Sequence, residues 1–183
     1  DHRYLHSFPT RRSSDLPFGY DHKYVYSHFG YNLKVTDMQA AVGCAQLAKL
    51  PGFIEARKNN WRMLRESLAG LEDRLILPEA TEHADPSWFG FLLTIRRGSG
   101  LTRDKLVSGL ESKGIQTRML FAGNLIKHPC FDEMRREGAG YRVIGTLPVT
   151  DQVMHDTFWI GVYPGMTSGM LAYVVETIGS YCR

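Results

Sequence analysis

The sequence has few cysteines, no long apolar run and little net charge, and each absence excludes a class of protein. Cys44, Cys130 and Cys182 are odd in number, far apart and without a CxxC pair, which argues for reduced thiols in a cytoplasmic protein and against a zinc site. No apolar run approaches the roughly 20 residues that a helix needs to cross a bilayer. Lys and Arg number 22 against 19 Asp and Glu, and they are spread along the chain. We therefore expect a cytoplasmic protein with no metal site of its own, no membrane segment and no nucleic-acid partner.

Motifs of common catalytic sites are also missing. There is no GxSxG motif, no P-loop and no GxGxxG, and the Ser, His and Cys residues stand in no triad context. His128 and His155 could each act as an acid or a base, but one histidine among seven is more often a surface or core residue. The residues alone therefore identify no catalytic group.

The composition is that of a globular protein, except for the first residues. Hydrophobic residues make up 43% of the chain and charged residues 22%, near the average for soluble domains. Residues 1–16, DHRYLHSFPTRRSSDL, show neither helical nor strand periodicity and lack the apolar core of a signal peptide. We expect either a disordered leader or a translated cloning scar here, and we leave these residues out of the fold.

Helix signals are clear in the rest of the chain. Thr36 followed by Gln39 is a capping-box pattern, so a helix should begin at about Asp37. It should end at Leu50, because Pro51 cannot donate the helical hydrogen bond. The small side chains of this helix would let another backbone come close, although high helix propensity explains its alanines equally well. An amphipathic helix is expected at 52–71, and shorter helices at 103–112, 131–136, 150–156 and 167–181.

Four short segments are typical of strands. They are rich in β-branched and aromatic residues and cover 74–78, 87–95, 115–121 and 159–163. Strands interspersed with helices favour an α/β domain in which helices pack on a small sheet, and the strand order is left open. We expect three parts: the leader at 1–16, a largely helical segment at 17–71 and a small α/β domain at 72–183.

A polar pair stands out where one expected strand ends. In GIQTRMLFAGNL the strand delivers Arg118, and Gly123-Asn124 then turn the chain. Arg offers a fixed fork of donors and Asn both a donor and an acceptor, so the two could hold an anionic or hydroxylated ligand. A structural ion pair of Arg118 beside a turn asparagine explains the same residues equally well.

The segment GYNLKVTDMQAAVGCAQLAKLPGFIEARKNNW, residues 30–61, resembles the G-Y-N-x-[RK]-x-T-x-x-x-A-A-x-G-x-x-Q-L segment of the DegT-type nucleotide-sugar aminotransferases. The similarity continues to TFWIGVYPGMT at 157–167 and covers about 17–181. PFGYDHKYVYSHFGYN, DPSWFGF and TRMLFAGN are most similar to the 3-dehydrases of this family that act on CDP-4-keto-6-deoxyglucose. The resemblance implies a fragment of a fold-type I pyridoxal-phosphate enzyme: the small C-terminal domain and a preceding helical segment with the end of the large domain.

The resemblance also assigns roles to four residues. Asn32, with Tyr31 beside it, matches the asparagine that reaches across a homodimer interface to the cofactor phosphate of the other subunit, although Asn32 alone would be interpreted as a turn residue. The small-sided helix would then lie in the dimer contact. Arg118 and Asn124 match TRxLFAGN and would face the nucleotide-sugar.

The implied parent enzyme removes the C3 hydroxyl of its substrate in 3,6-dideoxyhexose and O-antigen biosynthesis. It uses pyridoxamine phosphate, whose ring is the electron sink, and a [2Fe-2S] cluster supplied with electrons by a reductase. The catalytic residues and cluster ligands lie upstream in the enzymes it resembles, so we expect none in this chain and no turnover by the chain alone. A GDP-4-keto-6-deoxymannose 3-dehydratase, a pyridoxal-phosphate sugar aminotransferase and a stand-alone binding module remain alternatives.

Overall fold

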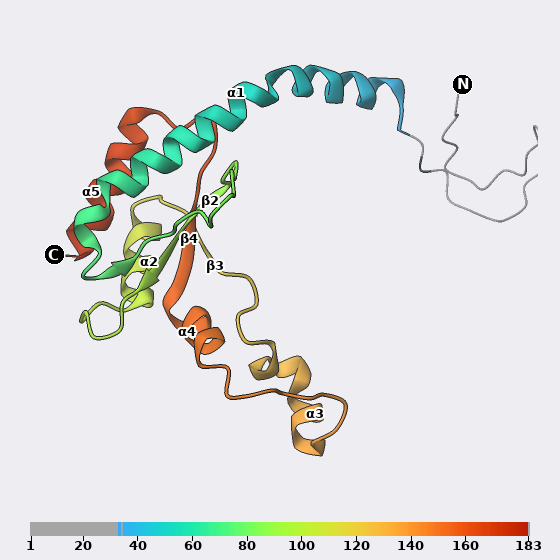
Figure 1. The fold of residues 1–183 in the computed structure, drawn as a ribbon, viewed down its shortest axis with the longest axis vertical. Coiled ribbons are helices and arrows are strands. Elements are labelled where there is room, and N and C mark those ends of the chain that lie inside the picture. Colours follow the sequence, from blue (N-terminus) through green and yellow to red (C-terminus); the bar gives the residue numbers. More distant parts are fainter. Residues whose placement is uncertain (1–32, 34, 183) are drawn as a thin grey trace, which may run out of the picture. The chain divides into compact units, whose positions relative to one another are not determined.

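The computed structural model describes residue 33 and residues 35–182 (Figure 1). The chain divides into two compact units, 1–50 and 51–183. Its helices are α1 (Asp37–Ser67), α2 (Arg103–Ser112), α3 (Asp132–Glu137), α4 (Pro148–Asp156) and α5 (Ser168–Cys182), and its strands are β1 (Leu75–Ile76), β2 (Gly90–Ile95), β3 (Thr117–Met119) and β4 (Thr157–Gly161). Short 3₁₀ turns lie at Ala69–Leu71, Leu125–Lys127 and Pro129–Phe131.

Helix α1 begins as predicted and continues through the residue expected to end it. The Gln39 side chain accepts from the Thr36 backbone N–H at 3.0 Å, and the Thr36 hydroxyl accepts from the Gln39 N–H at 3.3 Å, which completes the capping box. The predicted end at Leu50 is wrong, because Pro51 lies inside the helix. Proline removes one backbone hydrogen bond at a cost of about 3 kcal/mol, and α1 nevertheless continues as a single helix on both sides of it. Pro51 is also the first residue of the second compact unit.

The sheet has four antiparallel strands in the order β1-β2-β4-β3. Trp159 of β4 lies opposite Leu92 of β2 on one side and Arg118 of β3 on the other. Side chains alternate between the faces of a strand, so these three share one face. Their neighbours Phe91, Leu93, Phe158 and Ile160 are buried on the opposite face. β3 is an edge strand, which places Arg118 at the border of the sheet.

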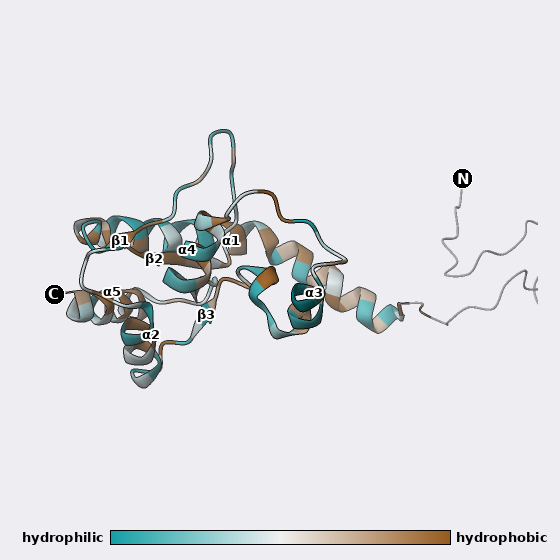
Figure 2. Ribbon diagram, turned by 90° about the horizontal axis from the view of Figure 1, so that it is seen from below, coloured by the Kyte–Doolittle hydropathy of each residue, from teal (hydrophilic) through white to brown (hydrophobic). Residues whose placement is uncertain are grey.

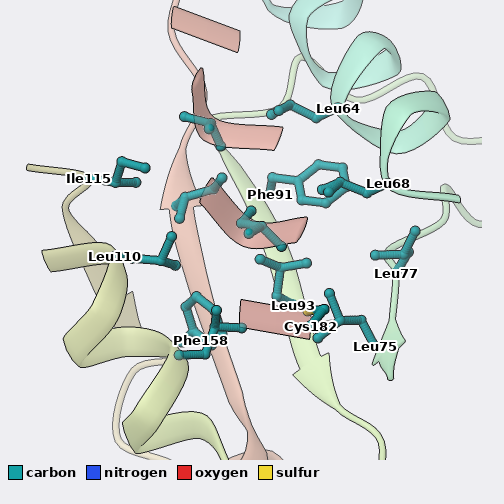
Figure 3. Packing of buried hydrophobic residues seen from close by; sticks show 14 of the residues in the cluster. Leu64, Leu68, Leu75, Leu77, Phe91, Leu93, Leu110, Ile115, Phe158 and Cys182 are labelled. Atoms are coloured by element: carbon teal, nitrogen blue, oxygen red, sulfur yellow. The ribbon is translucent and has the colours of Figure 1, made fainter. Parts of the chain in front are cut away.

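Three helical segments cover the buried face of the sheet in the second unit. Figure 3 shows Leu64 and Leu68 of α1 and Leu110 of α2 directed toward Phe91 and Phe158 of the strands. The core also takes in Leu171, Val174 and Ile178 of α5. The amphipathic stripe predicted for 52–71 is therefore confirmed as a core face, although the helix ends at Ser67 and a 3₁₀ turn follows.

The predicted fold class, helices packed on a small sheet, is confirmed. The second compact unit begins at Pro51, and the apolar face of α1 within it belongs to the same core as the sheet. The region between β3 and β4 holds the short helices α3 and α4; α3 is mostly hydrophilic (Figure 2), and α4 packs against β2 and β4. None of the helices described is long and apolar enough to span a membrane.

Candidate functional site

Arg118 stands on the border of the sheet with its charge uncommitted. It is exposed, and its guanidinium forms no ion pair within the described part of the chain. The neighbouring Trp159 is fixed, because its indole N–H donates to the Met119 carbonyl oxygen at 3.2 Å. An arginine held on a strand, beside an aromatic ring and without a partner, can bind an anion.

Arg118 lines a cavity of about 510 Å³ between the edge of the sheet and α5. Trp159 and Gly161 of β4 contribute to its walls together with Gln116, which directly precedes β3, and Tyr163 and Tyr173 add two more aromatic rings. The cavity lies within the 300–1,000 Å³ range of small-ligand pockets, and its walls are mainly apolar with a few polar groups. It can accept a ligand with a flat or apolar part and one negative group.

Two hydrogen bonds between lining residues and neighbouring helices stabilise the walls of this cavity. Asn60, which is buried on α1, donates its side-chain N–H to the Tyr163 carbonyl oxygen at 2.9 Å. The Tyr173 hydroxyl donates to the Lys113 carbonyl oxygen at 3.0 Å. These two bonds tie two lining segments to α1 and to the end of α2, so the cavity is braced by residues of the second unit.

Glu111 orders the strand that carries Arg118. Its carboxylate accepts from both the backbone N–H and the hydroxyl of Thr117 at 2.7 Å. These hydrogen bonds, with a smaller contribution from the positive charge of Arg118, lower the pKa of Glu111. The carboxylate thereby fixes the start of β3 without pairing directly with Arg118.

The loop after β3 is anchored to α4 through Asn124. Asn124 is 2% exposed, and its side-chain N–H donates to an Asp151 carboxylate oxygen at 2.7 Å. Lys127 forms an ion pair with the same oxygen at 2.8 Å. The hydrogen bonds from Lys127 and from Asn124 lower the pKa of Asp151. Asn124 thus holds the loop from inside, and it is not among the residues that line the cavity of Arg118.

Further contacts fix the same loop on both sides. Gly123 has φ +62°, and a Cβ there would come within 2.7 Å of the Met154 side chain, so a glycine is required for this approach. The His128 ring nitrogen bonds the Ala122 carbonyl oxygen, and Arg135 of α3 donates to the His128 carbonyl oxygen at 3.0 Å. The backbone of 120–128 is consequently well defined although it carries little regular structure.

Phe121, in the same loop, has an unfavourable backbone conformation. Its φ is +47°, its N–H donates to the Met119 carbonyl oxygen at 2.8 Å in a tight turn, and its side chain is 77% exposed. A positive φ is unusual for a bulky residue, and exposure means that no packing among the described residues compensates for it.

The structure shows where two of the four predicted site residues lie. Arg118 lines the cavity and Asn124 is buried in the adjacent loop, so the predicted pair is not brought together on one surface. Tyr31 and Asn32 lie outside the described residues. Of the two candidate histidines, His128 bonds backbone and His155 is exposed on α4.

Sequence reasoning missed the aromatic wall of the cavity. Trp159 and Tyr163 were assigned only to a strand, and Tyr173 only to the last helix. The signal was present in WIGVY, where the two aromatic residues are four apart and therefore on one face of an extended segment. Without the strand order, nothing in the sequence connected that face with Arg118.

The described residues do not form a complete site for a phosphorylated pyridine cofactor. The cavity has one cation, Arg118, and no lysine, histidine or carboxylate in its walls. This donor set fits one end of an anionic ligand, and a cofactor would need further donors from elsewhere. Cys44 and Cys130 are exposed and Cys182 is buried, and no cluster of three His, Cys, Asp or Glu that could hold a metal ion occurs among the residues described.

The sequence and the fold of helices on a small antiparallel sheet match a known family of enzymes. The model of the DegT/DnrJ/EryC1/StrS aminotransferase family matches residues 12–179, and the chain belongs to this family. Among curated relatives, dTDP-4-dehydro-2,6-dideoxy-D-glucose 3-dehydratase of Saccharopolyspora spinosa is 54% identical over 91% of the chain. The lipopolysaccharide biosynthesis protein RfbH of Salmonella typhimurium is also 54% identical, over 88% of the chain.

Solved structures support the same placement. The chain matches E. coli GDP-4-keto-6-deoxy-D-mannose-3-dehydratase with bound hydrated PLP at a TM-score of 0.70 and 26% identity, over 86% of this chain and 39% of that one. A structure of GDP-4-keto-6-deoxymannose-3-dehydratase with bound GDP-perosamine matches at a TM-score of 0.71 and 27% identity, over the same shares of the two chains. The chain spans only 35% and 36% of the length of the two curated relatives.

Proposed function

We propose that this chain is the C-terminal part of a nucleotide-sugar 3-dehydratase that uses pyridoxamine phosphate and acts on CDP-4-keto-6-deoxyglucose. The observation that carries the proposal is the 54% identity, over about nine-tenths of the chain, to two proteins of which one is named a sugar 3-dehydratase and the other a lipopolysaccharide biosynthesis protein. The place of the reaction would be 3,6-dideoxyhexose synthesis for O-antigen.

The chain's own contribution to this reaction is to bind and orient. Arg118 would hold the diphosphate of the nucleotide-sugar, because its guanidinium is uncommitted, fixed on a strand and suited to bidentate phosphate binding. Asn124 would act through Asp151 by fixing the loop next to the substrate, and so it becomes a positioning residue rather than a direct contact. Tyr31 and Asn32 would reach the cofactor phosphate of the partner subunit in a homodimer.

The remaining chemistry would come from polypeptide outside this chain. Pyridoxamine phosphate supplies an amine for the 4-keto group and a ring that accepts electrons. The [2Fe-2S] ligands, the active-site histidine and the docking site for an electron-donating reductase are expected there too. The 183-residue chain by itself should therefore bind substrate weakly and not turn it over.

A second candidate substrate differs in the nucleotide and, as the relative's name states, also lacks the C2 hydroxyl of the sugar. The identity to the dTDP-sugar dehydratase equals that to RfbH, so a dTDP-linked 4-keto sugar is supported to the same degree. The alternative to an enzyme fragment is a stand-alone binding module for nucleotide-sugars. Saturable binding of CDP-sugars by the chain alone, with the affinity of a complete enzyme, would favour this alternative.

The test is product analysis with the complete polypeptide encoded by the parent gene. It would be incubated with pyridoxamine phosphate, a reductase and either CDP-4-keto-6-deoxyglucose or the dTDP-linked sugar. Deoxygenation at C3 with the CDP-sugar is expected; formation of an amino sugar in the presence of glutamate would instead identify an aminotransferase. Gene sequence upstream of codon 17 offers a control, since a lysine in place of the active-site histidine and no cysteine cluster would also reject the dehydratase.

Arg118→Gln probes the role of this chain within that assay. Losing a charge-assisted hydrogen bond costs about 1.5–3 kcal/mol, so KM for the nucleotide-sugar should rise by roughly 10- to 150-fold. Arg62→Gln is a matched control, because Arg62 is also exposed on the second unit but is absent from the cavity walls. An unchanged KM in Arg118→Gln would exclude the diphosphate contact.

A further inference from the structure

The conformation of Phe121 is unfavourable for this chain considered by itself. A non-glycine residue in the left-handed region costs on the order of 1 kcal/mol or more, and asparagine or glycine would adopt φ +47° at lower cost. The residue is 77% exposed, so burial in the described part of the chain returns nothing. A residue held in an unfavourable backbone conformation without compensating packing is characteristic of positions that bind a ligand.

The turn is fixed by its surroundings and does not result from a loose loop. Before it, the Met119 carbonyl oxygen accepts both the Phe121 N–H and the indole N–H of Trp159. After it, Gly123 packs against Met154, and Asn124 is held by Asp151. The ring is therefore presented outward from a braced backbone, which lowers the entropy cost of using it as a binding surface.

The ring is also close to the free cation of the site. Phe121 follows Arg118 by three residues, so their Cα atoms are at most about 11 Å apart even in a fully extended chain. A guanidinium that can bind phosphate and a solvent-facing aromatic ring at this spacing match the two ends of a nucleoside diphosphate. Aromatic rings stack on any base, since each base offers a π-face.

We propose that Phe121 stacks on the base of the nucleotide whose diphosphate Arg118 binds. This inference rests on the proposed function. The ring contributes affinity for the nucleotide but does not select between cytosine, thymine and guanine. Phe121 thereby becomes a binding residue that supports affinity for the nucleotide half of the substrate.

The experiment compares ligands with and without a base on the complete polypeptide. Calorimetry would measure Kd for CDP, dTDP and inorganic pyrophosphate with Phe121→Ala, Phe121→Tyr and the unsubstituted protein. Phe121→Ala should weaken CDP and dTDP alike by about 5- to 150-fold, the range for loss of one base–aromatic stack, and leave pyrophosphate unchanged. Phe121→Tyr, which keeps a ring, should retain the unsubstituted affinities.

Two glycine variants separate binding from backbone strain. Phe121→Gly removes both the ring and the strain, so it should raise Tm while weakening CDP as the alanine variant does. His83 is exposed with φ +64° in a different loop, and His83→Gly should raise Tm without changing any Kd.

The outcomes distinguish the stacking proposal from the function on which it rests. CDP binding by the unsubstituted protein with no loss in Phe121→Ala would overturn the stacking alone. A fall in Tm of Phe121→Ala, with equal weakening of pyrophosphate and CDP, would show that the ring packs on the rest of the polypeptide and would also overturn it. Failure of the unsubstituted protein to bind any nucleoside diphosphate would reject both proposals.

Discussion

Gly90→Ala should displace the aromatic wall of the cavity. A Cβ on Gly90 would lie 2.4 Å from Cε3 and 2.9 Å from Cζ3 of Trp159, closer than any side-chain carbon tolerates. The indole cannot simply rotate away, because its N–H is bonded to the Met119 carbonyl oxygen on β3. The methyl group therefore acts on two neighbouring strand pairs, β2 with β4 and β4 with β3.

Overpacking of this kind costs about 1–3 kcal/mol. For a unit of about 130 residues, each kcal/mol lowers Tm by about 3–4 °C, so thermal unfolding followed by circular dichroism should shift by about 3–12 °C. Gly109→Ala is a matched control, because its Cβ would lie 2.3 Å from Tyr181 in the α2–α5 contact, away from the cavity. That variant should lose less stability, since alanine favours a helix over glycine by about 1 kcal/mol.

A double-mutant cycle identifies the cause. If the clash with the indole destabilises Gly90→Ala, the same substitution made in a Trp159→Ala background should cost little, because the ring is gone. An equal loss of Tm in both backgrounds would refute the reasoning, since the cost would then arise in the backbone of β2.

Three further predictions concern the loop, the thiols and the first helix. The pKa of Asp151 is lowered by its lysine and amide partners, so their contribution to stability is present above about pH 3.9 and is lost as the pH falls through the lower folded pKa. Proteolysis of the loop 120–128 should therefore become faster in acid, and Asp151→Asn should abolish this pH dependence. The same pH dependence of proteolysis in Asp151→Asn would contradict the assignment. Cys182 is buried and burial raises its pKa, so a thiol reagent should modify the other two cysteines in the folded chain and Cys182 only after unfolding; rapid reaction of three thiols would refute this. The segment 38–48 has no charged side chain and its large apolar residues are exposed, so the chain alone should self-associate. The double substitution Met38→Glu and Leu47→Lys should reduce the sedimentation coefficient at high concentration. If the unsubstituted chain sediments as a monomer, the helix has no buried role.

Much of the fold could be predicted because local signals agreed with the tertiary structure. The Thr36–Gln39 capping box, the Thr102 cap of α2 and the apolar stripe through Leu64 and Leu68 are short-range patterns, and each is present in the structure. The failure at Pro51 was of a different kind. The sequence shows that one backbone hydrogen bond is lost there, but not that good helix-forming segments on both sides continue the helix across it.

The candidate site was predictable only in part, because it depends on pairing between distant segments. Arg118 could be identified from its place in a strand. The cavity also requires Trp159 to pair with Arg118 and α5 to cross the edge of the sheet, and these contacts bring together residues about 40 or more apart in the chain. The conformation of Phe121 is likewise set by the turn around it, and no residue-type pattern signals a positive φ at a phenylalanine.

Amide hydrogen exchange on the complete polypeptide, with and without CDP-4-keto-6-deoxyglucose, tests most directly whether this part of the chain holds the nucleotide-sugar. Saturating ligand should slow exchange in β3 and in the loop through residue 128, while α3 remains unchanged. Protection elsewhere in the polypeptide, with exchange at 117–128 unaffected by saturating ligand, would contradict the account.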